Sequence, residues 1–462
     1  MKMKVSVIGL GKLGASMTAA IAKRGFDVIG VDVSEKAVAA VNAGRAPVQE
    51  TDLEETIAAN QNRIRATMSH AEAVLNSDIS FVIVPTPSDE RGAFSLQYAS
   101  WAFKEIGKAL SQKQGYHNVV MTSTVLPGST RYGLLPILEH ESGKKAGRDF
   151  GLCYSPEFIA LGSIIHDFLN PDFNLVGEID EYAGSQLEAF YKEIMENNSP
   201  CKRMSLENAE LTKISVNTFV TTKISFANML IDMCERIPGG DIDVVTDALG
   251  TDQRIGNKYL KGAIGYGGPC FPRDNVAFGF FARALESRAE LAETTDQFNR
   301  SIAGRIVEKF RALVQKGKTV AILGLAYKPY SHVLEESQGV YLAEAFSKAG
   351  ARVLGYDPMV GEDASKELHY ALVLDSLSKC LEQAEIVFIT NRDPVFDSIT
   401  ASDFKQNPVT VIDFWRTLES QLKGQPHIRY IPVGKSIDDE ANASRMIELW
   451  GITPQTVLDV VV

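Results

Sequence analysis

Short apolar runs alternate with helix-forming stretches along the first part of the chain. A β-branched run at 4–9 (KVSVIG) precedes a helical stretch at 15–24 and a second strand pattern at 27–31 (DVIGV). Strand, helix and strand within about 30 residues are typical of a βαβ unit. Later apolar runs extend the pattern at 79–84, 118–121 and 173–176. Helical stretches between these runs predict a parallel, doubly wound α/β sheet.

The pattern changes after Leu206. Residues 207–237 contain no proline or glycine, and their apolar residues recur at helical spacing. They predict one long helix, which at about 1.5 Å per residue would span about 45 Å. We expect such a helix to bridge two domains and to supply a dimer surface. Shorter helical patterns continue to about residue 312.

A second α/β pattern follows and echoes the first. Strand patterns at 318–325, 351–358, 385–390 and 409–413 accompany a helical stretch at 338–348. The first strand-to-helix turn here, Gly-Leu-Ala-Tyr-Lys-Pro, lacks the G-x-G-x-x-G spacing. We therefore expect this half to bind something other than a second dinucleotide.

The fold predicted is α/β, with two Rossmann-like, doubly wound domains joined by the long central helix. The predicted domains are 1–205, a central helical dimerisation domain at 206–312 that carries a cysteine loop, and 313–462.

Composition narrows the class of protein. With 462 residues, 45% hydrophobic and 23% charged, the chain can bury a large core in two or three domains. The net charge of −11 is spread out with no dense Lys/Arg run, which argues against nucleic-acid and membrane partners. No apolar run reaches the roughly 18 residues of a membrane span, and the N-terminus enters a strand pattern directly. We expect a cytoplasmic protein.

The cysteines predict neither a disulfide framework nor a metal site. None of the five belongs to a C-x-x-C pair or a close His/Cys set. They are Cys153, Cys201, Cys234, Cys270 and Cys380.

Three glycines between the first strand and helix predict a dinucleotide site. Gly9, Gly11 and Gly14 allow a tight turn, close approach of a pyrophosphate and close helix packing. Asp32 ends the next strand, where an acid can bind both ribose hydroxyls. This acid favours NAD over NADP, although Lys36 keeps NADP open; the alternative is a turn used only for packing. The predicted cofactor residues here are Gly9, Gly11, Lys12, Leu13, Gly14, Asp32 and Lys36.

Two further turns follow apolar strands, at 84–87 and 123–125. Carboxyl ends of strands line the ligand crevice of doubly wound sheets, which adds Thr86, Pro87, Ser123 and Thr124 to the cofactor prediction. A plain loop explains the local sequence equally well.

Lys213 and Asn217 lie four apart on the predicted long helix and so share one face, although an isolated pair of this kind is more often a solvated lysine. Glu157 follows Ser-Pro directly, and a carboxylate at a helix N-terminus explains it equally well.

Cys270 lies in the segment 265–274 (GYGGPCFPRD), off any helical or strand stripe. Arg273 and the amides near Gly267 and Gly268 are expected to lower its thiol pKa. Beside bound NAD, a thiolate suggests capture of an aldehyde, loss of hydride to give a thioester, and hydrolysis to a carboxylic acid.

These motifs resemble the UDP-glucose/GDP-mannose dehydrogenase family over almost the full chain. The matching segments, in family order, are GLGKLG, VDVS, STVLPGS, SPEF, AELTKISVNTF, RIGNKYLKGAIGYGGPCFPRD and GLAYKP. The resemblance implies an N-terminal NAD-binding domain, a central dimerising helix and a C-terminal domain that holds the nucleotide of a UDP-sugar. It also implies two successive NAD-dependent oxidations at C6.

The resemblance also implies residue roles. The implied catalytic set is Cys270 as nucleophile with Lys213, Asn217, Asp274, Thr124 and Glu157. Arg273 joins the implied cofactor contacts. The implied substrate set is Glu157, Phe158, Lys213, Asn217, Arg254, Tyr259, Lys261, Gly265, Gly267, Gly268, Lys328 and Arg416. Arg254 resembles an arginine lent by the neighbouring subunit, which implies a homodimer with a shared active site.

Several positions depart from the family pattern. Leu161 stands where many members have glutamate, and 335–337 (EES) where many have Arg-x-Ser. Arg416 is displaced by one position, and Pro269 and Arg273 replace the commoner serine and lysine.

The favoured reaction is oxidation of UDP-glucose to UDP-glucuronate, with UDP-N-acetylhexosamine and GDP-mannose left open. A two-electron hydroxyacid dehydrogenase and a non-catalytic NAD-binding regulator are the alternative classes. A hydroxyacid dehydrogenase needs neither the nucleophilic cysteine nor the C-terminal α/β half. A non-catalytic regulator would be expected to have lost the nucleophile or Lys213, and both are present.

Overall fold

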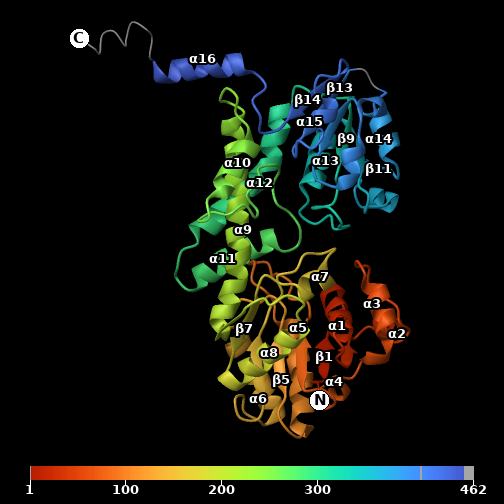
Figure 1. Ribbon diagram of the computed structural model, residues 1–462, viewed down its shortest axis with the longest axis vertical. Helices are drawn as coiled ribbons and strands as arrows, with labels where there is room; N and C mark the ends of the chain where they lie inside the picture. Colours follow the sequence, from red (N-terminus) through yellow and green to blue (C-terminus); the bar gives the residue numbers. More distant parts are fainter. Residues whose placement is uncertain (1, 406–407, 452–462) are drawn as a thin grey trace, which may run out of the picture. The chain divides into compact units, whose positions relative to one another are not determined.

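The computed structural model describes residues 2–405 and 408–451. The chain divides into two compact units, the first made of Met1–Val216 with Phe280–Glu286 and the second of Asn217–Gly279 with Ser287–Val462. Figure 1 labels the elements of both units.

Within the described residues, the first unit is built on an eight-stranded sheet of order β3-β2-β1-β4-β5-β6-β7-β8. Its strands are β1 (Val5–Ile8), β2 (Val28–Val31), β3 (Ile64–Thr67), β4 (Ile79–Val82), β5 (Asn118–Met121), β6 (Gly151–Tyr154), β7 (Asn174–Glu178) and β8 (Cys201–Ser205). Neighbouring strands are parallel except β6 and β7. This order places a topological switch point between β1 and β4, where doubly wound sheets bind ligands.

Helices of the first unit connect these strands. They are α1 (Lys12–Lys23), α2 (Glu35–Asn42), α3 (Leu53–Ala59), α4 (His70–Leu75), α5 (Gln97–Gln112), α6 (Leu135–Ser142), α7 (Ile164–Leu169) and α8 (Glu181–Ile194). A 3₁₀ turn (Gln61–Arg63) precedes β3, and a π-helical segment (Ser129–Leu134) precedes α6.

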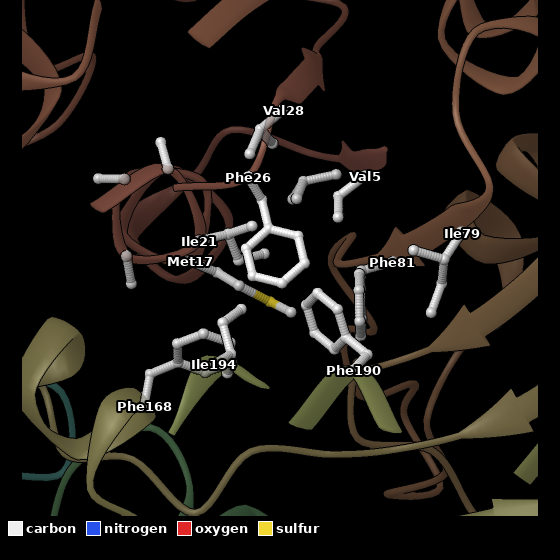
Figure 2. Close-up of a cluster of buried hydrophobic side chains, with 14 of the residues drawn as sticks. Val5, Met17, Ile21, Phe26, Val28, Ile79, Phe81, Phe168, Phe190 and Ile194 are labelled. Atoms are coloured by element: carbon white, nitrogen blue, oxygen red, sulfur yellow. The ribbon is translucent and has the colours of Figure 1, made fainter. Parts of the chain in front are cut away.

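An aromatic cluster anchors α1 to the sheet (Figure 2). Phe190 of α8 packs on Phe26 and Phe81, with ring centroids 5.5 and 5.1 Å apart. Met17 and Ile21 of α1 are buried in the same cluster. Burial of these side chains holds α1 against the sheet and so fixes where its N-terminus lies.

The strands predicted from the sequence of the first unit are confirmed, and three further strands were not predicted. These strands are β3, β6 and β8; β3 (IRAT) has an arginine within it, and β8 (CKRMS) is largely polar. The predicted parallel, doubly wound sheet is confirmed, with the exception that β6 and β7 pair antiparallel. Apolar runs show that a strand exists but carry no information on its direction.

The long helix is confirmed as α9 (Leu206–Cys234). It is followed by α10 (Ile242–Thr251), α11 (Phe271–Ala284) and α12 (Glu290–Phe310). The boundary between the two units falls inside α9 and inside α11. Among the described helices, none has both the length and the apolar content needed to cross a bilayer.

In the part of the second unit that the structure describes, a six-stranded parallel sheet has the order β11-β10-β9-β12-β13-β14. The strands are β9 (Thr319–Leu323), β10 (Arg352–Tyr356), β11 (Leu372–Val373), β12 (Ile386–Ile389), β13 (Val409–Asp413) and β14 (Ile428–Pro432). The helices are α13 (Gln338–Lys348), α14 (Leu377–Gln383), α15 (Glu419–Leu422) and α16 (Asp439–Trp450). The predicted second Rossmann-like half is thus confirmed, with β11 and β14 added.

Candidate active site

The turn between β1 and α1 requires glycine at two of its three motif positions. Gly9 has a φ of 103°, and a Cβ there would lie 2.0 Å from the carbonyl oxygen of Ile83. At Gly14 a Cβ would lie 1.9 Å from the carbonyl oxygen of Gly9. These distances are far below any tolerated contact, so both glycines are needed for the helix to pack closely on the strand.

Gly11 has a different surrounding. It is the N-cap residue of α1, and apart from Gly11 itself and its chain neighbours no atom of the described residues lies within 4 Å of the position its Cβ would take. The N-terminus of α1 therefore presents backbone amides and the positive end of the helix dipole to open space. This cradle fits the pyrophosphate of NAD.

The carboxylate of Asp32 is held in place at the end of β2. Its two oxygens accept hydrogen bonds from the amides of Leu10, at 2.7 Å, and Ser34, at 2.8 Å. Asp32 remains partly exposed, and Lys36 on α2 is exposed. A fixed, accessible acid beside the glycine turn suits the ribose hydroxyls of NAD.

The two turns after β4 and β5 are joined to each other. Thr86 Oγ1 donates to the carbonyl oxygen of Thr124 at 2.8 Å. Ser123 Oγ accepts from the amide of Val84 at 2.9 Å and donates to its carbonyl oxygen at 2.6 Å. These turns form one structured edge at the carboxyl ends of the strands, rather than two independent loops.

Glu210 of α9, a residue that the sequence analysis missed, holds the segment that follows the second of these turns. Its buried carboxylate accepts from the amides of Gly128, at 2.5 Å, and Thr130, at 2.8 Å. Burial raises the pKa of Glu210 to about 7, against the opposing effect of its hydrogen bonds. The available signal was an acidic residue in the otherwise uncharged turn before Lys213.

Lys213 and Glu157 lie together in the first unit. The buried ammonium of Lys213 donates to the backbone carbonyl of Glu157 and lies 4.4 Å from the ring centre of Phe158. The Oε1 atom of Glu157 is buried and has no hydrogen-bond partner in the described structure. Burial raises the pKa of Glu157 to about 8, and Lys213 opposes this rise. A carboxyl group with this pKa suits general acid and base chemistry near neutral pH.

Cys270 lies in the second unit at the start of α11. Its side chain is exposed, and its carbonyl oxygen accepts from the amide of Asp274 at 2.8 Å, which closes the first turn of the helix. A thiol at a helix N-terminus is in the environment that favours the thiolate. The sequence analysis placed this cysteine in a loop and overlooked the helix start, although Pro272 and Asp274 are typical of a first turn.

Asp274 is buried and accepts from the Asn217 side-chain amide at 2.6 Å. Arg273 lies 3.6 Å from the other carboxylate oxygen of Asp274. The positive charge of Arg273 is therefore shared with Asp274, and the start of α11 is the second source of positive potential near Cys270.

The glycines before Cys270 are required by packing within the second unit. A Cβ at Gly265 would lie 2.7 Å from Asn299 Oδ1, and one at Gly267 would lie 2.2 Å from the carbonyl oxygen of Glu336. Gly268 has a φ of 83°, and its Cβ would lie 2.5 Å from the ring of Tyr327. The sequence analysis assigned these glycines to the approach of a sugar nucleotide, and that role stays a prediction.

The other predicted substrate residues of the second unit are mostly exposed. Lys261 lies 3.8 Å from Asp243, and Arg254 pairs with its neighbour Asp252 at 2.6 Å. Tyr259 is exposed in a left-handed conformation with φ of 62°. The Lys328 ammonium lies 5.9 Å from the ring centre of Tyr327.

Arg416 differs from the rest because its side chain is only 1% exposed. Its guanidinium donates to both oxygens of Asp243, at 2.7 and 2.9 Å, and to the carbonyl oxygens of Gly262, Phe414 and Val433. These bonds use all its donor nitrogens within the chain. The structure therefore gives Arg416 an internal role, and its predicted contact with the substrate would require these bonds to be exchanged.

Comparison with known proteins identifies the family. The NAD-binding domain of the UDP-glucose/GDP-mannose dehydrogenase family matches residues 3–195, its central domain 207–301 and its UDP-binding domain 321–420. The chain belongs to this family. It is an oxidoreductase of the nucleotide-sugar dehydrogenase class with NAD as cofactor and a nucleotide sugar as substrate.

Some of the relatives are named as UDP-glucose dehydrogenases and others as GDP-mannose dehydrogenases. The chain is 34% identical over 391 residues to the UDP-glucose 6-dehydrogenase AglM of Haloferax volcanii, covering 84% of this chain and 90% of that protein. It is also 34% identical over 412 residues to the GDP-mannose 6-dehydrogenase of Pseudomonas putida, covering 86% and 93%. The structure of a UDP-glucose dehydrogenase from Pyrobaculum islandicum has a TM-score of 0.85 at 31% identity, covering 94% of this chain and 98% of that one.

Proposed function

We propose that this protein oxidises the C6 hydroxymethyl group of a nucleotide sugar to a carboxylate in two NAD-dependent steps, with UDP-glucose as substrate and UDP-glucuronate as product. The observation that carries the proposal is the exposed Cys270 at the N-terminus of α11, next to the hydrogen-bonded pair Asn217 and Asp274. A nucleophilic thiol is needed for the second oxidation and has no role in the first.

The proposed reaction begins at the C6 alcohol of the nucleotide sugar. Loss of a proton and a hydride converts the C6 alcohol to an aldehyde. The Cys270 thiolate adds to the aldehyde carbon, and the resulting oxyanion takes up a proton to give a thiohemiacetal. Loss of a second hydride and that proton leaves a thioester. Water then adds to the thioester carbon and gives up its two protons to basic side chains and solvent, the C–S bond breaks, and the carboxylate leaves the regenerated thiolate. Two molecules of NAD, bound one after the other, would each supply the hydride acceptor for one oxidation.

We propose roles for the other candidate site residues from the chemistry of their side chains. Lys213 and Asn217 are proposed to stabilise the negative charge that develops on the C6 oxygen. Asp274, Thr124 and Glu157 are proposed to orient and deprotonate the hydrolytic water. Because the pKa of Glu157 is raised to about 8, we expect thioester hydrolysis to accelerate as the pH rises toward that value.

UDP-glucose is proposed as substrate because the Haloferax volcanii relative and the Pyrobaculum islandicum structure carry that name. The Pseudomonas putida relative has the same 34% identity, so GDP-mannose is the second substrate to test.

The test is to count NADH formed per nucleotide sugar consumed, using UDP-glucose, GDP-mannose and UDP-N-acetylhexosamines. We expect two NADH per UDP-glucose, whereas one NADH would support the two-electron hydroxyacid type of reaction. No NADH with any sugar, in protein that still binds NAD, would support the non-catalytic alternative.

Cys270→Ser is expected to abolish formation of the acid while NAD binding measured by calorimetry stays unchanged. Wild-type turnover in this variant would rule out the covalent mechanism.

We also propose that the enzyme is a homodimer in which Arg254 acts on the partner's substrate. Along α9, Phe219 is 67% exposed and Met233 is 54% exposed, which is typical of a face that packs on another subunit. Co-expression of Cys270→Ser with Arg254→Ala tests this proposal. If Arg254 acts in trans, mixed dimers restore about one quarter of wild-type activity; if it acts in cis, none returns.

A further inference from the structure

The loop that leads to Cys270 cannot hold its own shape. Between Gly262 and Cys270 it contains four glycines, at positions 262, 265, 267 and 268. Glycine loses more conformational freedom on folding than any other residue. A fixed position for the thiol therefore needs hydrogen bonds from outside the loop.

Asn299 of α12 supplies two of these bonds. Its side chain is buried, its Oδ1 accepts from the amide of Tyr266 at 2.9 Å, and its Nδ2 donates to the carbonyl oxygen of Tyr266 at 2.9 Å. A single asparagine thus satisfies both polar groups of one backbone residue, as a neighbouring β-strand would.

Two more buried asparagines hold the loop on either side. Asn228 of α9 donates to the carbonyl oxygen of Ile264 and accepts from the amide of Ala263, both at 2.9 Å. Asn275 of α11 donates to the Tyr266 hydroxyl at 3.2 Å and to the carbonyl oxygen of Phe271 at 3.1 Å. The loop is therefore tied to three different helices.

We propose that Asn299 is a positioning residue for Cys270, and that Asn228 and Asn275 complete a clamp of three asparagines that fixes the loop before the nucleophile. The proposal rests on the proposed function of Cys270 as the nucleophile. Loss of the Asn299 side chain leaves the buried amide of Tyr266 unpaired and leaves the Tyr266 carbonyl oxygen with the longer bond from Gln338 Nε2, at 3.4 Å, so the loop moves to restore its hydrogen bonds. A displacement of about 1 Å at a reacting group is enough to reduce turnover by roughly 100-fold.

The test compares Asn299→Asp with wild type. The substitution keeps the size of the side chain and the acceptor for the Tyr266 amide, but it replaces the donor to the Tyr266 carbonyl. We expect kcat to fall roughly 10-fold to 100-fold while KM for the nucleotide sugar changes by less than about threefold. Hydrogen–deuterium exchange in the segment 262–270 is expected to become at least about 10-fold faster.

The matched control is Asn118→Asp in the first unit. Asn118 is likewise buried and donates to a backbone carbonyl, that of Ala183, at 2.9 Å. We expect this variant to keep wild-type kcat and wild-type exchange in 262–270. The proposal is overturned if Asn299→Asp keeps both wild-type values, or if Asn118→Asp loses them to the same extent.

Failure of the proposed function would appear separately. Hydrogen exchange needs no substrate, so it tests the clamp even if the wild type oxidises no nucleotide sugar. Conversely, wild-type turnover by Cys270→Ser would remove the reason for a catalytic role while leaving the exchange result intact. Asn299→Ala, which removes both bonds, is expected to exchange faster still and serves as the stronger variant if it folds.

Discussion

The turn from β1 to α1 and the turn from β9 to α13 have nearly the same backbone geometry but different sequences. Gly9 follows β1 with a φ of 103°, and Gly324 follows β9 with a φ of 101°. A Cβ at Gly14 would lie 1.9 Å from the carbonyl oxygen of Gly9, and a Cβ at Gly339 would lie 2.2 Å from that of Gly324. Both helices thus approach their strands through a glycine that faces a glycine.

The two turns also share an aspartate that follows the next strand, Asp32 after β2 and Asp357 after β10. Asp32 accepts from the amides of Leu10 and Ser34 at 2.7 and 2.8 Å. Asp357 accepts from the amides of Ala326 and Met359, both at 2.9 Å. Asp32 is partly exposed, whereas Asp357 is only 4% exposed, and burial raises its pKa.

The difference lies in the chain between the paired glycines. Five positions separate Gly9 from Gly14, whereas fifteen separate Gly324 from Gly339. The inserted residues include Tyr327 and Glu336, which pack against the glycines before Cys270. The close approach of helix and strand therefore does not depend on the spacing of the motif. The two halves match different domains of the family, the first its NAD-binding domain and the second its UDP-binding domain.

The largest effect expected is from alanine at the close glycines. Gly14→Ala and Gly339→Ala each force a Cβ into a backbone carbonyl, which is expected to destabilise its own unit by about 3 kcal/mol. Gly11→Ala is the control, because its Cβ meets no atom within 4 Å, and we expect a stability change within about 0.5 kcal/mol. Differential scanning calorimetry measures the unfolding temperature of each unit. An unchanged unfolding temperature for Gly14→Ala would show that the turn relaxes easily.

The same control variant separates stability from binding. Gly11→Ala places a methyl group in the open space at the N-terminus of α1, so we expect weaker NAD binding in a protein of normal stability. Gly339→Ala is expected to leave NAD affinity unchanged, because it alters only the second turn.

The next effect is on cofactor affinity. Asp32→Asn removes a charged acceptor for ribose hydroxyls, and we expect NAD binding to weaken roughly 10-fold to 100-fold. Asp357→Asn changes the buried counterpart and is expected to leave NAD affinity unchanged, as isothermal titration calorimetry would show. Equal losses in the two variants would mean that Asp32 acts only by holding its own turn.

The smallest effect is the fall in stability of the first unit between pH 7 and pH 8, which is at most about 1.4 kcal/mol. The pKa of Glu157 is raised from its ordinary value of 4.5 to about 8. Between these values the folded protein holds a proton that the unfolded chain has lost, so stability falls as pH rises. The expected fall is at most about 1.4 kcal/mol per pH unit, and ends above pH 8.

Two variants test whether Glu157 causes this fall in stability. Glu157→Gln is expected to flatten the unfolding temperature of the first unit between pH 7 and pH 8. Glu210→Gln is the control, because the pKa of Glu210 is about 7 and its own contribution is largely complete below pH 8. An unchanged slope in Glu157→Gln would mean that the Glu157 carboxyl group is solvated in solution. The second unit provides a reference transition in the same scans.

The sequence could name candidate site residues one by one, but it could not name the partners that the fold gives them. Lys213, Glu157 and Cys270 were identified from their sequence surroundings and their family motifs. The contact of Lys213 with Phe158 and the clamp on Tyr266 join residues that are far apart in sequence. No local pattern carries such pairings, because they depend on how the helices and strands pack.

The sequence by itself determined the α/β pattern of most strands and helices, the long α9 helix and the glycine turn at Gly9, and it named the residues proposed for chemistry. These depend on local spacing and on the backbone freedom of single residues, which neighbours in sequence reveal. Only the tertiary structure decided that β7 runs antiparallel to β6, that Gly339 faces Gly324 and that Arg416 turns inward to Asp243. Each of these is set by packing and hydrogen bonding between distant segments, where burial requires every polar group to find a partner.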